Sequence, residues 1–331
     1  MNLSCAMDLS VRIERWPLAN AFTISRGSKT EAVVVVAELS DGVYRGRGES
    51  VPYARYHESP DGVVAAIEAM RLELARGLDR TALQSAMPAG AARNALDCAF
   101  WDIGARQSGR RAYELAGIAA PKPRVTAYTI SLGAPAAMAE AAERAADRPL
   151  LKVKLGGRGD GERIAAVRRS APKAELIVDA NEGWDDDNLV QNLAVCAKAG
   201  VTLIEQPLPE GRDTALARIK RPIPLCADES VHDRGSLAAL AGKYDAINVK
   251  LDKTGGFTEA LALAAEAERH GFTIMVGCMV ATSLAMAPAM LVAQRASVVD
   301  LDGPLLLAKD RPEGLRYTGS LAYPPESALW G

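Results

Sequence analysis

Residues 149–155, PLLKVKL, place two lysines on a short segment that is otherwise apolar. The apolar residues predict a buried strand, and alternate side chains of a strand point to the same face. Lys152 and Lys154 must therefore project to one place, where a buried ammonium group is unfavourable unless something pairs with it. The segment predicts a charged site on one face of a sheet.

This segment is one of eight short apolar runs that follow residue 124, and helical patterns such as GERIAAVRRSA (161–171) lie between them. Strands that alternate with helices indicate βαβ units and a parallel sheet. Eight units in roughly 180 residues predict an α/β fold with a (β/α)8-type, modified TIM barrel. A doubly wound open sheet is the alternative, but no GxGxxG follows the first strand. The runs are VTAYTISL (125–132), PLLKVKL (149–155), ELIVDAN (175–181), TLIEQP (202–207), PLCADES (224–230), AINVKL (246–251), TIMVGC (273–278) and SVVDLDG (297–303).

The first 120 residues follow a different pattern. Residues 11–27 and 31–50 form short β-like stretches with turn residues such as Asp41-Gly42. Two helical patterns follow over residues 61–77 and 90–109, with apolar residues returning every three or four positions. Strands followed by helices predict an α+β module ahead of the barrel.

The composition excludes several classes of protein. A net charge of -2 gives no reason to expect nucleic acid or an anionic membrane surface as partner. No apolar run approaches the ~20 residues that span a bilayer. The five cysteines are an odd number and show no CxxC spacing, which indicates reduced thiols in a cytoplasmic protein.

Seven of the eight runs carry a polar residue near the C-terminal end. In a barrel these residues would form a ring at the rim where active sites are built. Three successive carboxylates of the ring, Asp179, Glu205 and Asp228, repel one another unless a cation lies among them, and hard oxygen ligands favour Mg2+. The alternative is a set of buried ion pairs with the neighbouring lysines, which would contribute little net stability. The ring is Lys154, Asp179, Glu205, Asp228, Lys250, Cys278 and Asp302, at spacings of 25, 26, 23, 22, 28 and 24 residues.

Five short motifs occur in order within the barrel region, and ARNALDCAFWDIGA (92–105) precedes them. They are the KxK of 152–154, the DxN of 179–181, Glu205-Gln206-Pro207, Asp228-Glu229-Ser230 and the KxD of 250–252. Together they resemble the enolase superfamily in its muconate-lactonising subgroup, and most closely the dipeptide epimerases. The resemblance covers essentially the whole chain. It implies an α+β capping domain over 1–120, the barrel over 121–304, and a segment over 305–331 that returns to the cap.

The resemblance also implies a mechanism. Lys154 and Lys250 would be bases on opposite faces of the substrate α-carbon, so that one removes the α-proton to give an enediolate and the other returns it. To act as base Lys154 must be neutral, and the charges of Lys152 and the metal, with desolvation, lower its pKa. Lys152 would stay charged beside the substrate carboxylate. One Mg2+, with Mn2+ as a substitute, would be bound by Asp179, Glu205 and Asp228.

Substrate selection depends on other residues. Asp300 and Asp302 share one face of the last strand. In the resembled dipeptide epimerases this DxD binds the substrate α-ammonium. The alternative is that the two residues belong to a solvated turn or cap the next helix. Arg26, in a cap loop, would grip a side-chain carboxylate bidentately, which favours glutamate as the second residue; the alternative is an ordinary exposed arginine. The other residues expected to bind substrate are Thr129, Asn181, Cys278 and Met279.

These observations predict an isomerase that epimerises dipeptides at the C-terminal residue's α-carbon, with L-Ala-D/L-Glu as the leading substrate and murein peptide metabolism as its setting. The alternatives on the same scaffold are an N-acylamino acid racemase, an o-succinylbenzoate synthase and a muconate cycloisomerase, and a metal-stabilised binding protein is a third class. The DxD argues against the succinylbenzoate and muconate enzymes, whose substrates carry no ammonium. We expect a small dipeptide as partner, no nucleic acid and no membrane, and leave a homo-oligomer open.

Overall fold

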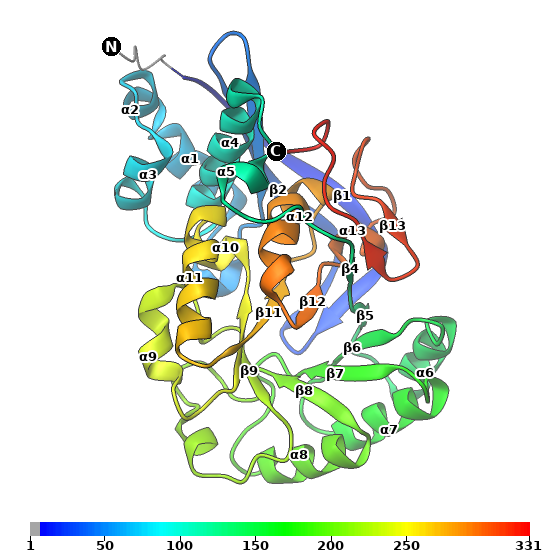
Figure 1. Cartoon of the computed structure of the whole chain (residues 1–331). Helices are drawn as coiled ribbons and strands as arrows, with labels where there is room; N and C mark the ends of the chain where they lie inside the picture. The colour runs from blue at the N-terminus through cyan, green and yellow to red at the C-terminus, as the bar shows by residue number, and fades with distance from the viewer. Residues whose placement is uncertain (1–6) are drawn as a thin grey trace.

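The computed structural model describes residues 7–331 and shows eight parallel strands curled into a nearly closed barrel (Figure 1). The strands are neighbours in chain order, and each corresponds to one of the eight predicted runs. The two ends of the sheet are bridged, since Ala127 N–H donates to Val299 O at 2.8 Å and Leu301 N–H donates to Thr126 Oγ1 at 2.8 Å. The predicted barrel is confirmed. Its strands are β5 (Tyr128–Ile130), β6 (Leu150–Lys154), β7 (Glu175–Asp179), β8 (Val201–Glu205), β9 (Leu225–Ala227), β10 (Ala246–Val249), β11 (Thr273–Gly277) and β12 (Val298–Asp300).

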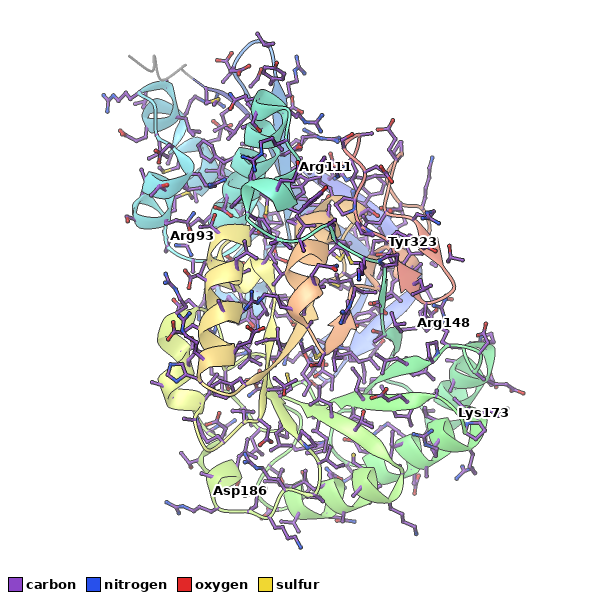
Figure 2. The ribbon with its side chains drawn as sticks, viewed as in Figure 1. Arg93, Arg111, Arg148, Lys173, Asp186 and Tyr323 are labelled. Atoms are coloured by element: carbon purple, nitrogen blue, oxygen red, sulfur yellow. The ribbon has the colours of Figure 1, made fainter. Side chains whose placement is uncertain are left out.

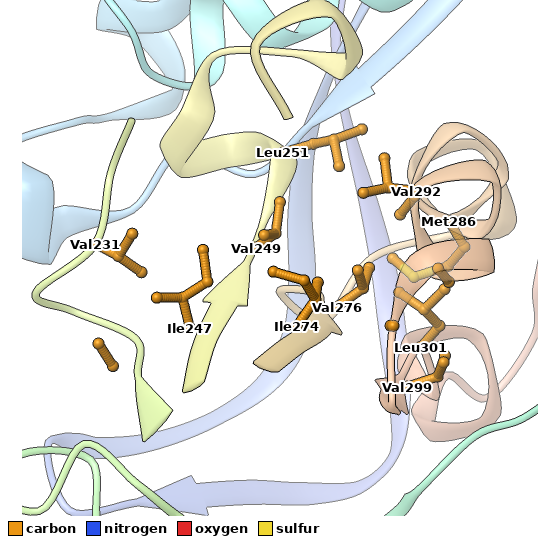
Figure 3. Packing of buried hydrophobic residues seen from close by; sticks show 14 of the residues in the cluster. Val231, Ile247, Val249, Leu251, Ile274, Val276, Met286, Val292, Val299 and Leu301 are labelled. Atoms are coloured by element: carbon orange, nitrogen blue, oxygen red, sulfur yellow. The ribbon is translucent and has the colours of Figure 1, made fainter. Parts of the chain in front are cut away.

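Helices cover the outside of the barrel and exclude water from the outward faces of the strands (Figure 1). In α7, Ile164 and Val167 are buried one turn apart, while acidic residues in the first turn and arginines in the last complement the helix dipole. Figure 3 shows the same packing around Val249, Val276 and Met286, which belong to one large apolar cluster. The helices of the barrel region, including the short α10 and α13 that follow β10 and β12, are α6 (Pro135–Arg144), α7 (Asp160–Ser170), α8 (Leu189–Lys198), α9 (Leu237–Leu240), α10 (Leu251–Thr254), α11 (Phe257–Arg269), α12 (Ser283–Val292) and α13 (Gly303–Leu306).

The inward faces of the strands carry two layers of different chemistry. The lower layer is a small apolar cluster that closes the barrel interior and is composed of Ala127, Leu150, Ile177, Leu203, Cys226, Ala246 and Met275. Two residues further along, the next inward position is charged or polar on most of these strands, and Asp300 likewise follows Val298, which packs against the lower layer. This second layer is Lys152, Asp179, Glu205, Asp228, Asn248 and Asp300, all buried.

The N-terminal domain packs an antiparallel sheet against helices. Gly46 and Gly48 allow the third strand to lie directly on a helix, because a Cβ at either glycine would come within 2.2 Å of Ile103 N or 2.1 Å of Ala95 O. The pattern over 61–77 forms two helices, since the chain tightens to an i to i−3 hydrogen bond at its middle. The elements are β1 (Asp8–Ile24), β2 (Gly27–Ser40), β3 (Arg45–Ser50), α1 (Pro60–Glu68), α2 (Arg71–Ala75), α3 (Arg80–Ala86), α4 (Ala91–Ser108) and α5 (Ala112–Leu115).

The C-terminal residues contact both parts of the molecule. Strands β13 (Tyr317–Thr318) and β14 (Leu321–Ala322) form an antiparallel sheet with β4 (Arg124–Val125). At the end of the chain, Trp330 Nε1–H donates to Cys98 O of α4 at 3.1 Å, and Gly331 N–H donates to Asp102 Oδ1 at 2.8 Å. The domain boundaries at residues 120 and 304 stay a prediction.

Four of the five cysteines lie within the described residues. Cys98, Cys196, Cys226 and Cys278 are free thiols, and Cys5 lies outside the described residues. Between residues 7 and 331 there is no helix with the length and hydrophobicity that crossing a bilayer requires.

Candidate active site

Three carboxylates meet above the apolar floor of the barrel. Asp179 ends β7, Glu205 ends β8 and Asp228 follows β9; one oxygen atom from each lies within 4.8 Å of the others, and all three side chains are buried. Burial and the neighbouring carboxylate of Asp179 raise the pKa of Glu205 to about 8. A cation would relieve this repulsion, so the donor set and its charge fit a hard divalent metal.

Two lysines flank the carboxylates on opposite sides. Lys154 Nζ lies 2.6 Å from Asp179 Oδ2, and Lys250 Nζ lies 2.6 Å from Asp228 Oδ2. Strands β6 and β10 are four positions apart in an eight-stranded barrel, so these lysines enter from opposite walls. Burial lowers the pKa of Lys250, but the carboxylates of Asp228 and Glu205 outweigh it and hold the pKa well above its usual value.

Lys152 lies deeper than Lys154 and is enclosed by carboxylates. Its Nζ is 2.6 Å from Glu205 Oε2, 2.7 Å from Asp300 Oδ2 and 3.2 Å from Asp179 Oδ2. Burial lowers the pKa of Lys152, but the three neighbouring carboxylates raise it by more. The pKa therefore lies well above its usual value, and the group stays charged. Both lysines of the KVK segment therefore point into one charged cluster.

The DxD of the last strand adjoins this cluster. Asp300 Oδ2 accepts from Lys152, whereas Asp300 Oδ1 is buried and has no hydrogen-bond partner among the described residues. Asp302 Oδ2 accepts from the backbone N–H of Thr129 at 2.7 Å. Burial, and next the charge of Asp300, raise the pKa of Asp302 to about 7. The free oxygen of Asp300 is an acceptor that an ammonium group can satisfy.

A cavity of about 490 Å³ lies between the barrel rim and the N-terminal domain. The predicted site residues that line it are Arg26, Lys154, Asn181, Asp228, Lys250, Cys278 and Met279. The other members of the cluster are buried beside this cavity rather than on its wall. Thr129 lines a separate cavity of about 320 Å³, and its backbone N–H donates to Asp302. Its expected contact with substrate stays a prediction.

Arg26 lies in the turn between β1 and β2, and its guanidinium bonds to protein groups. Nη1–H donates to Asn181 O at 2.9 Å and to Glu182 Oε2 at 3.1 Å. Nη2–H donates to Glu229 Oε1 at 2.6 Å and to Tyr53 OH at 3.0 Å. The turn does close over the barrel as expected, but the terminal nitrogens of Arg26 are already engaged.

Several residues of the site carried no assigned role in the sequence. Asn248 Nδ2–H donates to Glu205 Oε1 at 2.7 Å, and Lys253 Nζ lies 2.5 Å from Asp228 Oδ1. Asn248 is two positions before Lys250, so strand alternation could have found it. The cap contributes Phe22, Ile24, Lys29, Tyr53 and Tyr56 to the cavity wall, and no local pattern marks these residues.

Comparisons with known proteins agree with this architecture. A family model described as "Enolase C-terminal domain-like" matches residues 137–321, and one described as "Mandelate racemase / muconate lactonizing enzyme, N-terminal domain" matches residues 6–117. The chain is 48% identical over 307 residues to an L-Ala-D/L-Glu epimerase of Escherichia coli K12, covering 92% of this chain and 96% of that protein. It is 46% identical over 303 residues to an N-acetyl-D-glutamate racemase of a Pseudoalteromonas species, covering 90% and 95%.

A solved structure is also similar. It is an enolase family member from Agrobacterium tumefaciens with homology to dipeptide epimerases, described with bound sodium and L-Ala-L-Glu. It is 56% identical to this chain, with a TM-score of 0.97, and the match covers 98% of this chain and all of that one.

Proposed function

Because the chain belongs to the enolase superfamily, with the N-terminal domain of mandelate racemase and muconate lactonizing enzyme, we propose that it epimerises dipeptides at the α-carbon of the C-terminal residue, with L-Ala-D/L-Glu as substrate. The observation that carries this proposal is the pair Lys154 and Lys250, which face one cavity from opposite walls of the barrel. A 1,1-proton transfer that inverts an α-carbon needs one proton-transfer group on each face.

The two lysines divide the proton transfer. Lys154 takes the α-proton from one face, and Lys250, held protonated by Asp228 and Glu205, gives a proton to the opposite face. The roles reverse for the other epimer, and one proton leaves and one arrives in each turnover. Lys152 remains charged within its three carboxylates and supplies fixed positive potential near the substrate carboxylate.

Asp179, Glu205 and Asp228 would hold one Mg2+, and Mn2+, which takes similar oxygen ligands, would substitute. When bound, the metal would withdraw charge from the substrate carboxylate and thereby make the α-proton more acidic. Burial, and next the repulsion from Asp179, raise the pKa of Glu205, and this unfavourable charge supports the assignment.

Asp300 and Asp302 would bind the substrate's α-ammonium. The support is the buried oxygen of Asp300 that no described residue satisfies, beside a second carboxylate two positions away. An N-acylamino acid racemase is the second candidate, favoured by the 46% identity to an N-acetyl-D-glutamate racemase. Its substrate has no ammonium and would leave that oxygen unpaired, so the geometry favours the dipeptide.

Uptake of deuterium at the α-carbon in D2O tests the choice directly. We expect L-Ala-L-Glu to exchange and epimerise, and N-acetyl-L-Ala-L-Glu to lose about thirty- to several-thousand-fold in kcat/KM because a buried charge pair loses one partner. N-acetyl-L-glutamate is the matched comparison. An acetylated dipeptide turned over as fast as the free one, or N-acetyl-L-glutamate preferred to both, would replace the dipeptide assignment with the racemase.

The proposal extends to the setting of the enzyme and to its domain organisation. L-Ala-D/L-Glu places the enzyme in murein peptide metabolism, and the free thiols of Cys98, Cys196, Cys226 and Cys278 support a reducing cytoplasm. We assign the capping domain to residues 1–120, the barrel to 121–304 and the returning segment to 305–331. Size-exclusion chromatography with light scattering would determine whether the chain forms a homo-oligomer.

A further inference from the structure

One cation on the cavity wall has no ionic partner. Lys29 is half-buried on β2 and lines the cavity together with Lys154 and Lys250. Across residues 7–331, no carboxylate lies within ion-pair distance of its ammonium group, and no hydrogen bond involves it. Its neighbour is Phe22, whose ring centroid lies 5.9 Å from Lys29 Nζ. An ammonium group placed in this way favours an anionic ligand.

The electrostatics of the cavity agree with that interpretation. Burial, and next the charge of Lys154, lower the pKa of Lys29, and Lys250 acts in the same direction. Lys154 and Lys250 are both paired with carboxylates, whereas Lys29 is not. A second negative charge on the substrate would therefore find its partner at Lys29.

Arg26 is a poorer candidate for that partner. Both of its terminal nitrogens already donate to protein acceptors, two of which are the carboxylates of Glu182 and Glu229. Glu229 is buried, so releasing Arg26 to bind substrate would leave a buried carboxylate without its cation. The contacts of Arg26 with Asn181 O and the two glutamates instead hold the β1–β2 turn on the barrel rim.

Lys29 is within reach of the carboxylate of a glutamyl side chain whose α-carbon lies beside Lys154. The centroid of the Phe22 ring lies 5.9 Å from Lys29 Nζ and 5.8 Å from Lys154 Nζ, so the two ammonium groups are at most about 12 Å apart. A reacting α-carbon lies roughly 3–3.5 Å from its base. Three C–C bonds add roughly 4 Å, and the carboxylate oxygen with its hydrogen bond adds roughly 4 Å more.

We propose that Lys29 binds the side-chain carboxylate of the dipeptide's second residue and thereby selects glutamate. This inference rests on the proposed dipeptide epimerisation and names the specificity-determining residue of that same site. Arg26 then acts as a positioning residue that holds the turn from which β2, and with it Lys29, begins.

The test compares two isosteric substrates, L-Ala-L-Glu and L-Ala-L-Gln, which differ in charge at the side chain. We expect Lys29→Met to lower the ratio of their kcat/KM values roughly 10- to 100-fold, because one charged hydrogen bond is lost. The change should appear mainly in KM for L-Ala-L-Glu, since the side-chain carboxylate is bound alike in ground and transition states. Lys29→Arg should retain most of the preference.

Lys173→Met is the matched control, because Lys173 is exposed and lies at the outer edge of the barrel, far from the cavity (Figure 2). Arg26→Met should lower kcat/KM for both dipeptides to a similar extent. An unchanged Glu/Gln ratio in Lys29→Met would overturn the proposal, and a ratio that collapses only in Arg26→Met would return the role to Arg26.

Calorimetric binding of the same two dipeptides separates the two possible failures. Wild-type protein that binds but never epimerises them would refute the proposed reaction, while the Glu/Gln affinity ratio would still report on Lys29. A wild-type protein that binds L-Ala-L-Glu no better than L-Ala-L-Gln would refute the role of Lys29.

Discussion

At the scale of single residues, position along one strand separates two lysines of the same type. Lys152 occupies the inward position directly above the apolar floor, and three carboxylates surround it there. Lys154 is one inward position higher, pairs with Asp179 alone and lines the cavity. Two residues of strand rise, about 6.6 Å, thus separate a lysine enclosed by carboxylates from a lysine on the cavity wall.

We expect Lys154→Ala and Lys250→Ala each to lower epimerisation by a factor of at least about 100, because each removes one of two required proton-transfer groups. Either variant should still exchange the α-proton of the one epimer that its remaining lysine faces. Proton NMR in D2O, with each epimer supplied separately, measures both quantities. Wild-type epimerisation by both variants would contradict the assignment.

Removal of divalent metal should abolish activity. Without a cation, the carboxylates of Asp179, Glu205 and Asp228 repel one another and nothing acidifies the substrate α-proton. Chelation followed by addition of Mg2+ or Mn2+ should restore the rate, whereas Na+ at the same ionic strength should not, because its single charge polarises a carboxylate less. Full activity in metal-free enzyme would exclude the metal site as catalytic.

At the scale of elements, the short helix α10 joins the barrel to the N-terminal domain through one buried carboxylate. Asp252 Oδ1 accepts from Val51 N–H at 2.9 Å and from Asn94 Nδ2–H at 2.8 Å. Burial raises the pKa of Asp252 to about 7. The sequence places Asp252 in the KxD motif close to Lys250, but its hydrogen bonds are with Val51, directly after β3, and with Asn94 of α4, both in the N-terminal domain.

This carboxylate should make stability depend on pH. Because its folded-state pKa exceeds the unfolded value, the folded protein binds the proton more tightly, and the free energy of unfolding falls as pH rises from about 4 to about 7. Asp252→Asn cannot ionise, so its advantage over wild type should grow by roughly 2–4 kcal/mol between pH 4 and pH 8.

Urea unfolding at several pH values measures this difference. Asp186→Asn, at an exposed position on the barrel (Figure 2), serves as the control and should follow the wild-type curve. A difference between Asp252→Asn and wild type that does not change with pH would show that Asp252 is not protonated more readily in the folded protein.

At the scale of the whole molecule, one arginine joins segments from both ends of the chain. Arg311 Nη2 lies 2.5 Å from Glu14 Oε2 on β1 and 2.6 Å from Glu49 Oε2 on β3, and Arg311 Nε–H donates to Thr282 Oγ1 at the start of α12. Burial raises the pKa of Glu49 even though Arg311 lowers it. Arg311 therefore neutralises the negative charge of Glu49, whose carboxylate is buried between the domains.

We expect Arg311→Met to lower the free energy of unfolding by roughly 3–5 kcal/mol, because it leaves the charge of Glu49 buried and unpaired. Arg45→Met is the matched control, since the Arg45–Glu38 pair is exposed and should contribute less than about 1 kcal/mol. Guanidinium chloride unfolding gives both values. A loss below about 1 kcal/mol for Arg311→Met would show that Glu49 accommodates burial without its arginine.

The sequence by itself determined the barrel and the chemistry of its rim. Short apolar runs at one β/α period place the ends of parallel strands at one edge, and a side-chain period of two brings Lys152, Asp179 and Glu205 to one face. Both rules act within a strand or between adjacent repeats, so they need no knowledge of distant contacts. For the same reason Asn248, at an inward position before Lys250, was within reach of the pattern.

The residues that the N-terminal domain contributes to the cavity wall are visible only in the folded structure. Ser25 Oγ–H donates to Asn181 O across 156 positions of the chain, and this docking brings Phe22 and Lys29 to the cavity. The same docking engages Arg26 with protein carboxylates, which its exposed place in a turn did not indicate. Such contacts depend on how the N-terminal domain packs on the barrel, and neither periodicity nor local motif encodes that geometry.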